Sequence, residues 1–154
     1  MAIKLNSLKA DMRRINDGEW VTIDELPDGD GGFVQFKVRG NAYGPYQTDL
    51  SNVRMRWSRK YESKQLATPP EVLSRDLSHL YAKHLLLDWK GFDEPYSMEL
   101  AEEMLNSTGE FFNHVQYAVN YVSRTDAELV EDMSKNSQPS SGGTSKTVKL
   151  QATG

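Results

Sequence analysis

Hydrophobic and polar residues alternate along a short stretch near the start of the chain. In residues 33–39, FVQFKVR, the apolar Val34, Phe36 and Val38 alternate with the polar Gln35, Lys37 and Arg39. A period of two is typical of a strand with one buried face, and residues 20–23 also have the composition of a strand. Because the turn sequence LPDGDGG lies between them, the pattern predicts a β-hairpin. An isolated hairpin is marginal in water, so we expect this one to pack on helices or on another chain.

Apolar residues three or four positions apart predict two helices in the first half of the chain. Residues 7–16 are expected to form a short helix that Ser7 caps. Its apolar face would contain Leu8, Met12 and Ile15. After the breaker GNAYGP, residues 46–63 predict a longer helix. Its apolar stripe would contain Leu50, Val53, Met55 and Trp57.

The sharpest helix start is TPPE, residues 68–71. It places Thr68 as the cap, a proline at the first helical position and Glu71 three residues after the cap. The predicted helix continues to Gly91, which would end it as the left-handed residue just past the last turn. Its broad apolar face would contain Leu73, Leu77, Leu80, Tyr81, His84, Leu85 and Leu87.

Two further helix starts follow the linker FDEPY. Ser97 is the predicted cap of a helix that carries Leu100, Met104 and Leu105 and turns its glutamates outward. Ser107 and Glu110 repeat the capping-box pattern and open a last helix. That helix would run through Val122, and the pattern allows it to continue to Met133.

Together these elements predict a mostly α-helical α+β domain, in which an N-terminal β-hairpin packs against about four helices. The predicted domain spans residues 1–133, and a chain of 154 residues is long enough to bury its own core. Residues 134–154, SKNSQPSSGGTSKTVKLQATG, have no apolar period and too few hydrophobic groups to offset chain entropy. They are predicted to be a flexible, disordered C-terminal tail.

The formal net charge of −4 is unevenly distributed. Residues 1–75 carry 12 basic and 10 acidic side chains, residues 76–133 carry 3 and 12, and residues 134–154 carry 3 and none. An excess of acids repels phosphate backbones and attracts basic partners. The acidic helical half is therefore expected to bind protein rather than nucleic acid.

Cysteine and long apolar segments are both missing from the sequence. With no cysteine, the chain has no disulfide, no thiolate nucleophile and no Cys-based zinc site. The longest apolar run is LLL, residues 85–87, far short of the roughly 18 residues of a membrane span. The N-terminus has no signal-peptide core. We therefore expect a soluble protein of the cytoplasm with no membrane partner.

No group of residues predicts a reaction. His79, His84 and His114 have no metal-ligand spacing, and His84 on the apolar face is expected to be a hydrogen-bonded core residue. No nucleophile or phosphate-loop motif occurs, and the paired acids are expected to form a solvated or partner-facing surface. DGDG, residues 28–31, resembles a calcium loop, but Arg39 stands where its final glutamate belongs. The sequence predicts a non-enzymatic protein with no metal and no cofactor.

One stretch mixes cations with aromatics, which is the pattern of a nucleic-acid surface. It contains Arg54, Arg56, Trp57, Arg59, Lys60 and Tyr61. The favoured interpretation is a helix whose Trp57 packs inward while its arginines face solvent or bridge to the acidic half.

The layout of residues 85–122, LLLDWKGFDEPYSMELAEEMLNSTGEFFNHVQYAVNYV, resembles small proteins of tailed bacteriophages. In them an apolar helix ends in an Asp-Trp-x-Gly turn, a linker leads to a Tyr-Ser helix start, and a last helix carries aromatics and valines. The matching positions are Asp88, Trp89, Gly91, Tyr96, Ser97, Leu100, Leu105, Phe111, Phe112 and Val115. The sequence thus resembles the bacteriophage tail assembly chaperone family, of the small siphovirus type.

This resemblance implies a helper that binds the long tape measure protein, keeps it soluble and recruits tail-tube protein. It also implies action in the host cell cytoplasm and absence from the mature virion. The partner-binding residues it suggests are Trp89, Tyr96, Leu100, Glu102, Glu103 and Met104. Whether the chain forms a homo-oligomer stays open.

Two other functions remain in view. A minor structural protein of the phage tail or baseplate would use the hairpin as a strand-donating edge. A nucleic-acid-binding regulator would use Arg54, Arg56, Trp57 and Arg59, and its binding would weaken steeply with salt.

Overall fold

The computed structural model describes residues 2–124. Residues 10–124 form one compact unit, and residues 2–9 are described by themselves as a segment with one 3-10 turn, Leu5–Leu8. The predicted C-terminal tail, residues 134–154, and the continuation of the last helix to Met133 lie outside the described residues.

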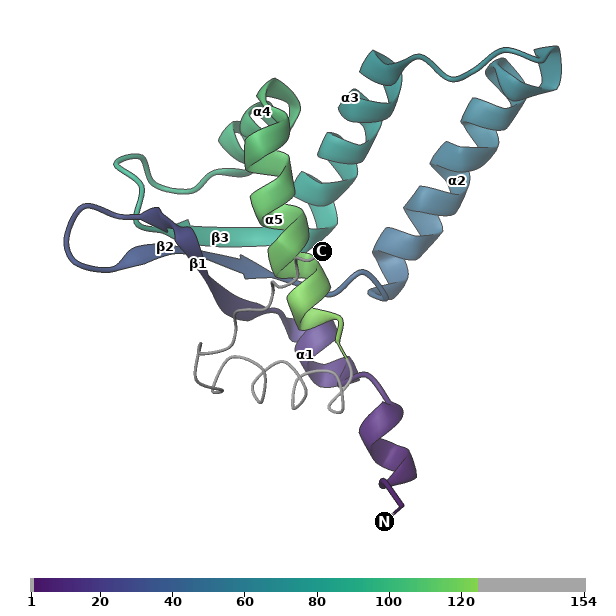
Figure 1. Ribbon diagram of the computed structural model, residues 1–154. Coiled ribbons are helices and arrows are strands. Elements are labelled where there is room, and N and C mark those ends of the chain that lie inside the picture. The colour runs from purple at the N-terminus through teal and green to yellow at the C-terminus, as the bar shows by residue number, and fades with distance from the viewer. Residues whose placement is uncertain (1, 125–154) are drawn as a thin grey trace, which may run out of the picture. The chain divides into compact units, whose positions relative to one another are not determined.

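The compact unit contains five α-helices and three strands among its described residues (Figure 1). In chain order they are α1 Met12–Asp17, β1 Glu19–Pro27, β2 Phe33–Val38, α2 Gly44–Lys60, α3 Pro70–Leu80, β3 Leu86–Lys90, α4 Met98–Ser107 and α5 Gly109–Val122. A 3-10 turn, Glu62–Lys64, follows α2, and a π-helical turn, Tyr81–Leu85, follows α3. The predicted α+β class, a hairpin with helices packed on it, is confirmed.

The sheet is antiparallel in the order β1-β2-β3, so the predicted hairpin forms its first two strands. Phe36 lies at its centre, opposite Val21 on β1 and Trp89 on β3. The alternation in β2 holds, because Val34, Phe36 and Val38 are all buried. α5 packs across β1 and β2 and covers this apolar face (Figure 1).

The prediction of one helix over residues 68–91 is wrong in its second half. α3 ends at Leu80, a π-helical turn follows, and Leu86–Lys90 forms a third strand that pairs with β2. A short apolar run such as LLL fits a buried helix or a buried strand equally well. Pairing with the open edge of β2 decides between them, because it satisfies backbone groups that would otherwise be buried unpaired.

The first helix is shorter than predicted. α1 begins at Met12, and Asp11 rather than Ser7 is its cap, since its carboxylate accepts the backbone N–H groups of Arg13 and Arg14 at 3.1 and 3.2 Å. Of the predicted apolar face only Ile15 is buried; Leu8 and Met12 are exposed.

Two of the other predicted caps are also displaced. α3 starts at Pro70 with Pro69 in the cap position, and the buried Thr68 hydroxyl has no hydrogen-bond partner among the described residues. α5 is capped by Thr108, not by Ser107. Ser107 and Thr108 are adjacent and both suit a cap, whereas Pro69 has no side-chain acceptor, so α3 has no side-chain cap.

The predicted helix over residues 46–63 is confirmed as α2, which begins two residues earlier and ends at Lys60. Its buried side chains are Tyr46, Leu50, Val53 and Trp57. Met55, expected in the apolar stripe, is exposed instead.

Candidate functional site

Helix α4 carries the predicted partner-binding residues and presents three different faces. Ser97 caps it as predicted, because its hydroxyl accepts the backbone N–H of Leu100 at 3.1 Å. Ala101 and Leu105 point into the core. Glu99 and Glu103 are exposed. Between the acids and the core, the helix leaves Leu100 and Met104 half-buried at the surface.

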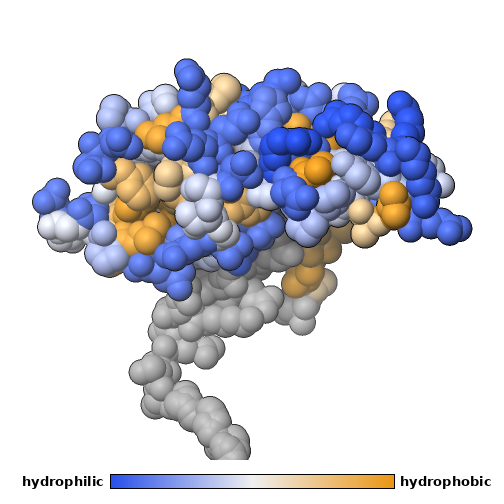
Figure 2. Space-filling model, turned by 90° about the horizontal axis from the view of Figure 1, so that it is seen from above, coloured by the Kyte–Doolittle hydropathy of each residue, from blue (hydrophilic) through white to orange (hydrophobic). Residues whose placement is uncertain are grey.

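A pocket of about 130 Å³ opens between α4 and residues 91–97, the loop that joins β3 to α4. We call it the α4 pocket. It is lined by Trp89, Phe92, Asp93, Glu94, Leu100, Met104 and Phe111. Seen from above, hydrophobic side chains gather at the left of the molecule, the end at which this loop lies, with hydrophilic groups around them (Figure 2).

Trp89 forms the floor of the α4 pocket and fixes the loop above it. Its indole N–H donates to the backbone carbonyl of Glu94 at 2.8 Å, which brings the loop back along β3. Tyr96 fastens the other end of the loop, since its hydroxyl donates to the carbonyl of Leu86 at 2.9 Å. The Tyr96 and Trp89 rings also meet edge to face, 5.2 Å apart. The loop is therefore held at two points by aromatic side chains.

Gly91 makes the sharp turn from β3 into this loop. Its φ of +99° lies in the left-handed region, which favours glycine. A Cβ added there would lie 3.0 Å from the backbone Cα of Val34, so no side chain fits without movement. The turn lays Phe92 against Phe36, Trp89 and Phe111, with ring centroids 5.5 to 6.2 Å apart. Gly91 was expected to end a helix; it ends a strand.

The structure brings together part of the predicted partner-binding set. Trp89, Leu100 and Met104 line the α4 pocket, and Tyr96 supports it from behind. Sequence reasoning missed Phe92, Asp93 and Glu94, which complete the pocket. The available signal was an aromatic residue followed by two acids directly after the glycine of a tight turn.

Four acids of this loop and of the exposed face of α4 have no ion-pair partner among the residues that the structure describes. Among residues 2–124, no lysine, arginine or histidine lies within 4.0 Å of the carboxylates of Asp93, Glu94, Glu99 or Glu103. Glu99 and Glu103 are four residues apart on one helix, a like-charge spacing that slightly destabilises a helix. Asp93 and Glu94 line the α4 pocket, whereas Glu99 and Glu103 border a separate hollow together with Arg75.

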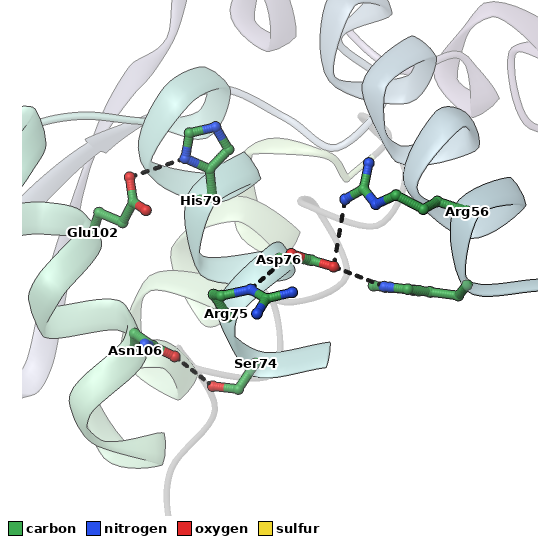
Figure 3. Close-up of polar contacts among 8 residues, drawn as sticks. Arg56, Ser74, Arg75, Asp76, His79, Glu102 and Asn106 are labelled. Carbon is green, nitrogen blue, oxygen red and sulfur yellow. Dashed lines mark hydrogen bonds and ion pairs between the residues drawn. The ribbon is translucent and has the colours of Figure 1, made fainter. Parts of the chain in front are cut away.

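Glu102 lies beside Glu99 and Glu103 in that hollow, but it joins α4 to α3. Its carboxylate lies 3.0 Å from the Nδ1 atom of His79 (Figure 3). One turn away, the Ser74 hydroxyl donates to the Asn106 side-chain carbonyl at 3.0 Å. Glu102 thus has a structural contact within the chain, in contrast to Glu103.

On its other side, α3 is joined to α2 through Asp76 (Figure 3). The Asp76 carboxylate accepts the indole N–H of Trp57 at 2.8 Å and lies 3.5 Å from Arg56 and 3.2 Å from Arg75. Burial acts to raise the pKa of Asp76, but these hydrogen bonds and the two positive charges outweigh it and lower the pKa. Asp76 is therefore a charged structural group.

Comparison with known proteins shows to which family the chain belongs. A family model described as "YdaY prophage protein" matches residues 40–136, more than half of the chain. The chain belongs to the YdaY prophage protein family. The match includes α2 to α5 and the whole α4 pocket. No curated protein and no solved structure matches the chain. The bacteriophage origin that the resemblance implied is confirmed, while the family description names no tail assembly activity.

In this YdaY-family chain the basic stretch of α2 has the favoured arrangement, in which Trp57 packs inward and the arginines face solvent or bridge to the acidic half. Trp57 is buried with 9% of its surface exposed, and Arg56 bridges to Asp76 in the acidic half. Arg54 and Arg59 are exposed. Because its ring is largely packed inside, Trp57 leaves little surface for stacking on a base.

The histidine prediction is also confirmed in this family member. His84 is 8% exposed, and its Nε2 atom lies 2.7 Å from the carboxylate of Asp49, which also contacts Lys83 at 3.2 Å. The hydrogen bond to His84, followed by that to Lys83, lowers the pKa of Asp49.

The remaining sequence candidates are turn or surface groups. Asp28 accepts the backbone N–H groups of Asp30 and Gly32 at 2.7 and 3.1 Å, so it closes the hairpin turn. Within residues 2–124 no three histidine or acidic side chains are grouped so that they could hold a metal ion. The same residues contain no helix that is both long and apolar enough to cross a membrane.

Proposed function

We propose that this YdaY-family chain is a non-enzymatic phage tail assembly chaperone, which binds the tape measure protein, keeps it soluble and promotes tail-tube assembly. One observation carries the proposal: two acids, Asp93 and Glu94, line a mostly apolar pocket at the surface of α4 and have no ion-pair partner among the described residues. The protein would act in the host cytoplasm and be absent from the mature virion.

The surface suits a protein that holds another chain in solution. A long helical protein exposes an apolar stripe until it is assembled, and a helper must cover that stripe without aggregating itself. Apolar contact supplies affinity, and a rim of like charges keeps the complex soluble and speeds encounter with a basic partner. The α4 pocket and its carboxylates combine both properties.

The resemblance to tail assembly chaperones supports the same function. Trp89, Gly91, Tyr96 and Ser97 are among its matching positions, and in the structure they build the loop and helix that frame the α4 pocket. The shared layout thus corresponds to one surface feature.

Co-expression with the tape measure protein of the same phage tests the proposal. The tape measure protein should move from the insoluble to the soluble fraction and co-purify with this chain. A chain with Glu94→Lys and Glu103→Lys should lose this effect, and a chain with Glu71→Lys, an exposed acid at the start of α3, should keep it. An insoluble tape measure protein in the presence of the folded chain would refute the proposal.

The position of β1 supports a second candidate, a minor structural protein of the tail or baseplate. Within the described residues β1 pairs only with β2, so its outer edge is available to a strand of another chain. Mass spectrometry of purified virions separates the two functions. A stoichiometric amount of this protein in the virion favours the structural one, and its absence favours the chaperone.

A further inference from the structure

We propose that the α4 pocket receives a single aliphatic or methionine side chain from a partner helix that carries lysine or arginine on both sides of that side chain. The inference deepens the proposed function, on which the identity of the natural partner rests. The kind of side chain that the pocket binds follows from the shape and charge of this surface alone.

The size of the pocket limits what can enter it. Pockets for small-molecule ligands have volumes of roughly 300–1,000 Å³, whereas a cavity of about 150 Å³ holds one benzene molecule. At about 130 Å³, the α4 pocket has room for one leucine-sized group. It therefore suits an anchoring side chain of a protein.

The lining provides both a rigid floor and an adaptable mouth. Trp89 and Phe111 are buried and held edge to face, 6.1 Å between centroids. Leu100 and Met104 are half-buried at the rim, and Phe92 leaves 38% of its surface exposed. Aromatic rings at the base of a pocket are frequent energetic centres of interfaces, and methionine adjusts to different shapes. An aliphatic chain would meet mostly apolar atoms there.

Charge determines what flanks this anchor. Asp93 and Glu94 line the pocket from the loop, while Glu99 and Glu103 stand on the exposed face of α4. Glu103 is three residues from Leu100, so the two side chains are neighbours on the helix surface. Asp93 and Glu94 thus line the pocket itself, while Glu103 stands beside Leu100 and also borders a separate hollow with Arg75. Among the described residues, none of these three acids has a basic group within 4.0 Å.

These two groups of acids favour basic residues on both sides of the anchor. On a helix, residues three or four positions before and after a central residue share its face. A leucine with lysines at those positions would place its apolar group in the pocket and an ammonium near each group of acids. Long lysine stems also cover apolar surface beside the mouth.

Synthetic peptides test this with the full chain. The probe is a capped helical peptide with a central leucine and lysines three and four residues to either side. One matched peptide replaces the leucine with serine, and another replaces the lysines with glutamates. In isothermal titration calorimetry, the serine peptide should bind at least about tenfold more weakly than the leucine peptide, as expected for the loss of one buried leucine. The glutamate peptide should not bind.

A charge exchange identifies the surface. The Glu94→Lys and Glu103→Lys chain should bind the lysine peptide several-fold more weakly than the native chain and gain binding to the glutamate peptide. The Glu71→Lys chain, with the same kind of charge change elsewhere, should bind like the native chain. Binding of the lysine peptide should also weaken from about 50 mM to about 300 mM salt, because exposed charges are screened.

Equal binding of the leucine and serine peptides would overturn the inference, as would unchanged binding by the charge-exchanged chain. Self-association that the Glu94→Lys and Glu103→Lys changes abolish, measured by sedimentation, would overturn it too, because a second copy would then occupy the pocket. If the peptides behave as expected and the tape measure protein is not solubilised, the pocket stands and the chaperone function fails. If the tape measure protein is solubilised and the peptides bind equally, the chaperone function stands and the inference about the pocket fails.

Discussion

Trp57 of α2 and Asp76 of α3 are joined by a hydrogen bond of 2.8 Å between the indole N–H and the carboxylate. Trp57 is buried, and the Asp76 side chain is only 11% exposed. Replacing Asp76 with alanine leaves a buried N–H without an acceptor, so the free energy of unfolding should fall by about 1–3 kcal/mol. Asp76→Asn, which keeps an acceptor oxygen, should lose less. Urea denaturation measures both, and equal losses would contradict this assignment.

The two aspartates with lowered pKa should make the fold sensitive to acid. Asp76 and Asp49 have pKa values below the ordinary 3.8 in the folded protein. A carboxylate with a lowered pKa contributes stability above its unfolded pKa and loses it as the pH falls toward the folded one. The urea midpoint should therefore drop below about pH 4. In Asp76→Asn this drop should be smaller, and an identical pH profile for the variant would exclude a role for Asp76.

Gly91 should be far less tolerant of substitution than Gly109. Gly91 combines a φ of +99° with a 3.0 Å approach to the Val34 backbone, whereas no atom outside its own neighbours lies within 4 Å of a Cβ added at Gly109. Gly91→Ala should cost about 1–3 kcal/mol through backbone strain. Gly109→Ala, in the first turn of α5, should be neutral or stabilising by up to about 1 kcal/mol. Thermal unfolding of the two variants gives the comparison, and similar melting temperatures would contradict it.

Thr108 and Ser107 offer a direct test of which residue caps α5. The Thr108 hydroxyl accepts the backbone N–H groups of Glu110 and Phe111 at 3.0 and 3.2 Å. The Ser107 hydroxyl instead donates to the carbonyl of Met104 at 3.0 Å, at the end of α4. Thr108→Ala should therefore cost about 1 kcal/mol, and Ser107→Ala clearly less. Chemical denaturation of the two variants decides, and the opposite order would restore Ser107 as the cap.

The hairpin could be predicted from the sequence because its information is local. Alternation in β2 and the glycine-rich turn both follow from neighbouring residues, and both are present in the structure. The path from α3 to β3 could not be predicted in the same way. Leu85, the last residue of the π-helical turn, and Leu86, the first residue of β3, are both completely buried, so burial does not distinguish a helix from a strand. Pairing with β2, far away in the sequence, selects the strand.

In the candidate site, too, the local features could be predicted from the sequence and the long-range ones could not. Leu100 and Met104 follow from helical periodicity and an identified cap. Asp93 and Glu94 enter the pocket only because Gly91 reverses the chain and Trp89 holds the loop by a hydrogen bond. Glu102 and Glu103 are adjacent acids in the sequence, and the position of His79 on α3 gives one of them a partner. Such differences arise from tertiary contacts.

Tyr81, the first residue of the π-helical turn, should be the last tyrosine to ionise. Its ring is buried against Tyr46 and Phe112, with centroids 6.0 and 4.7 Å away. Burial, with a smaller contribution from Tyr46, raises the pKa of Tyr81 to about 12. Because the folded pKa is raised, the folded state should lose stability as the pH rises from about 10 toward 12. Absorbance of the phenolate during a pH titration should show a late component that Tyr81→Phe removes. A single transition near pH 10 in a chain that is still folded would show that Tyr81 is accessible to water.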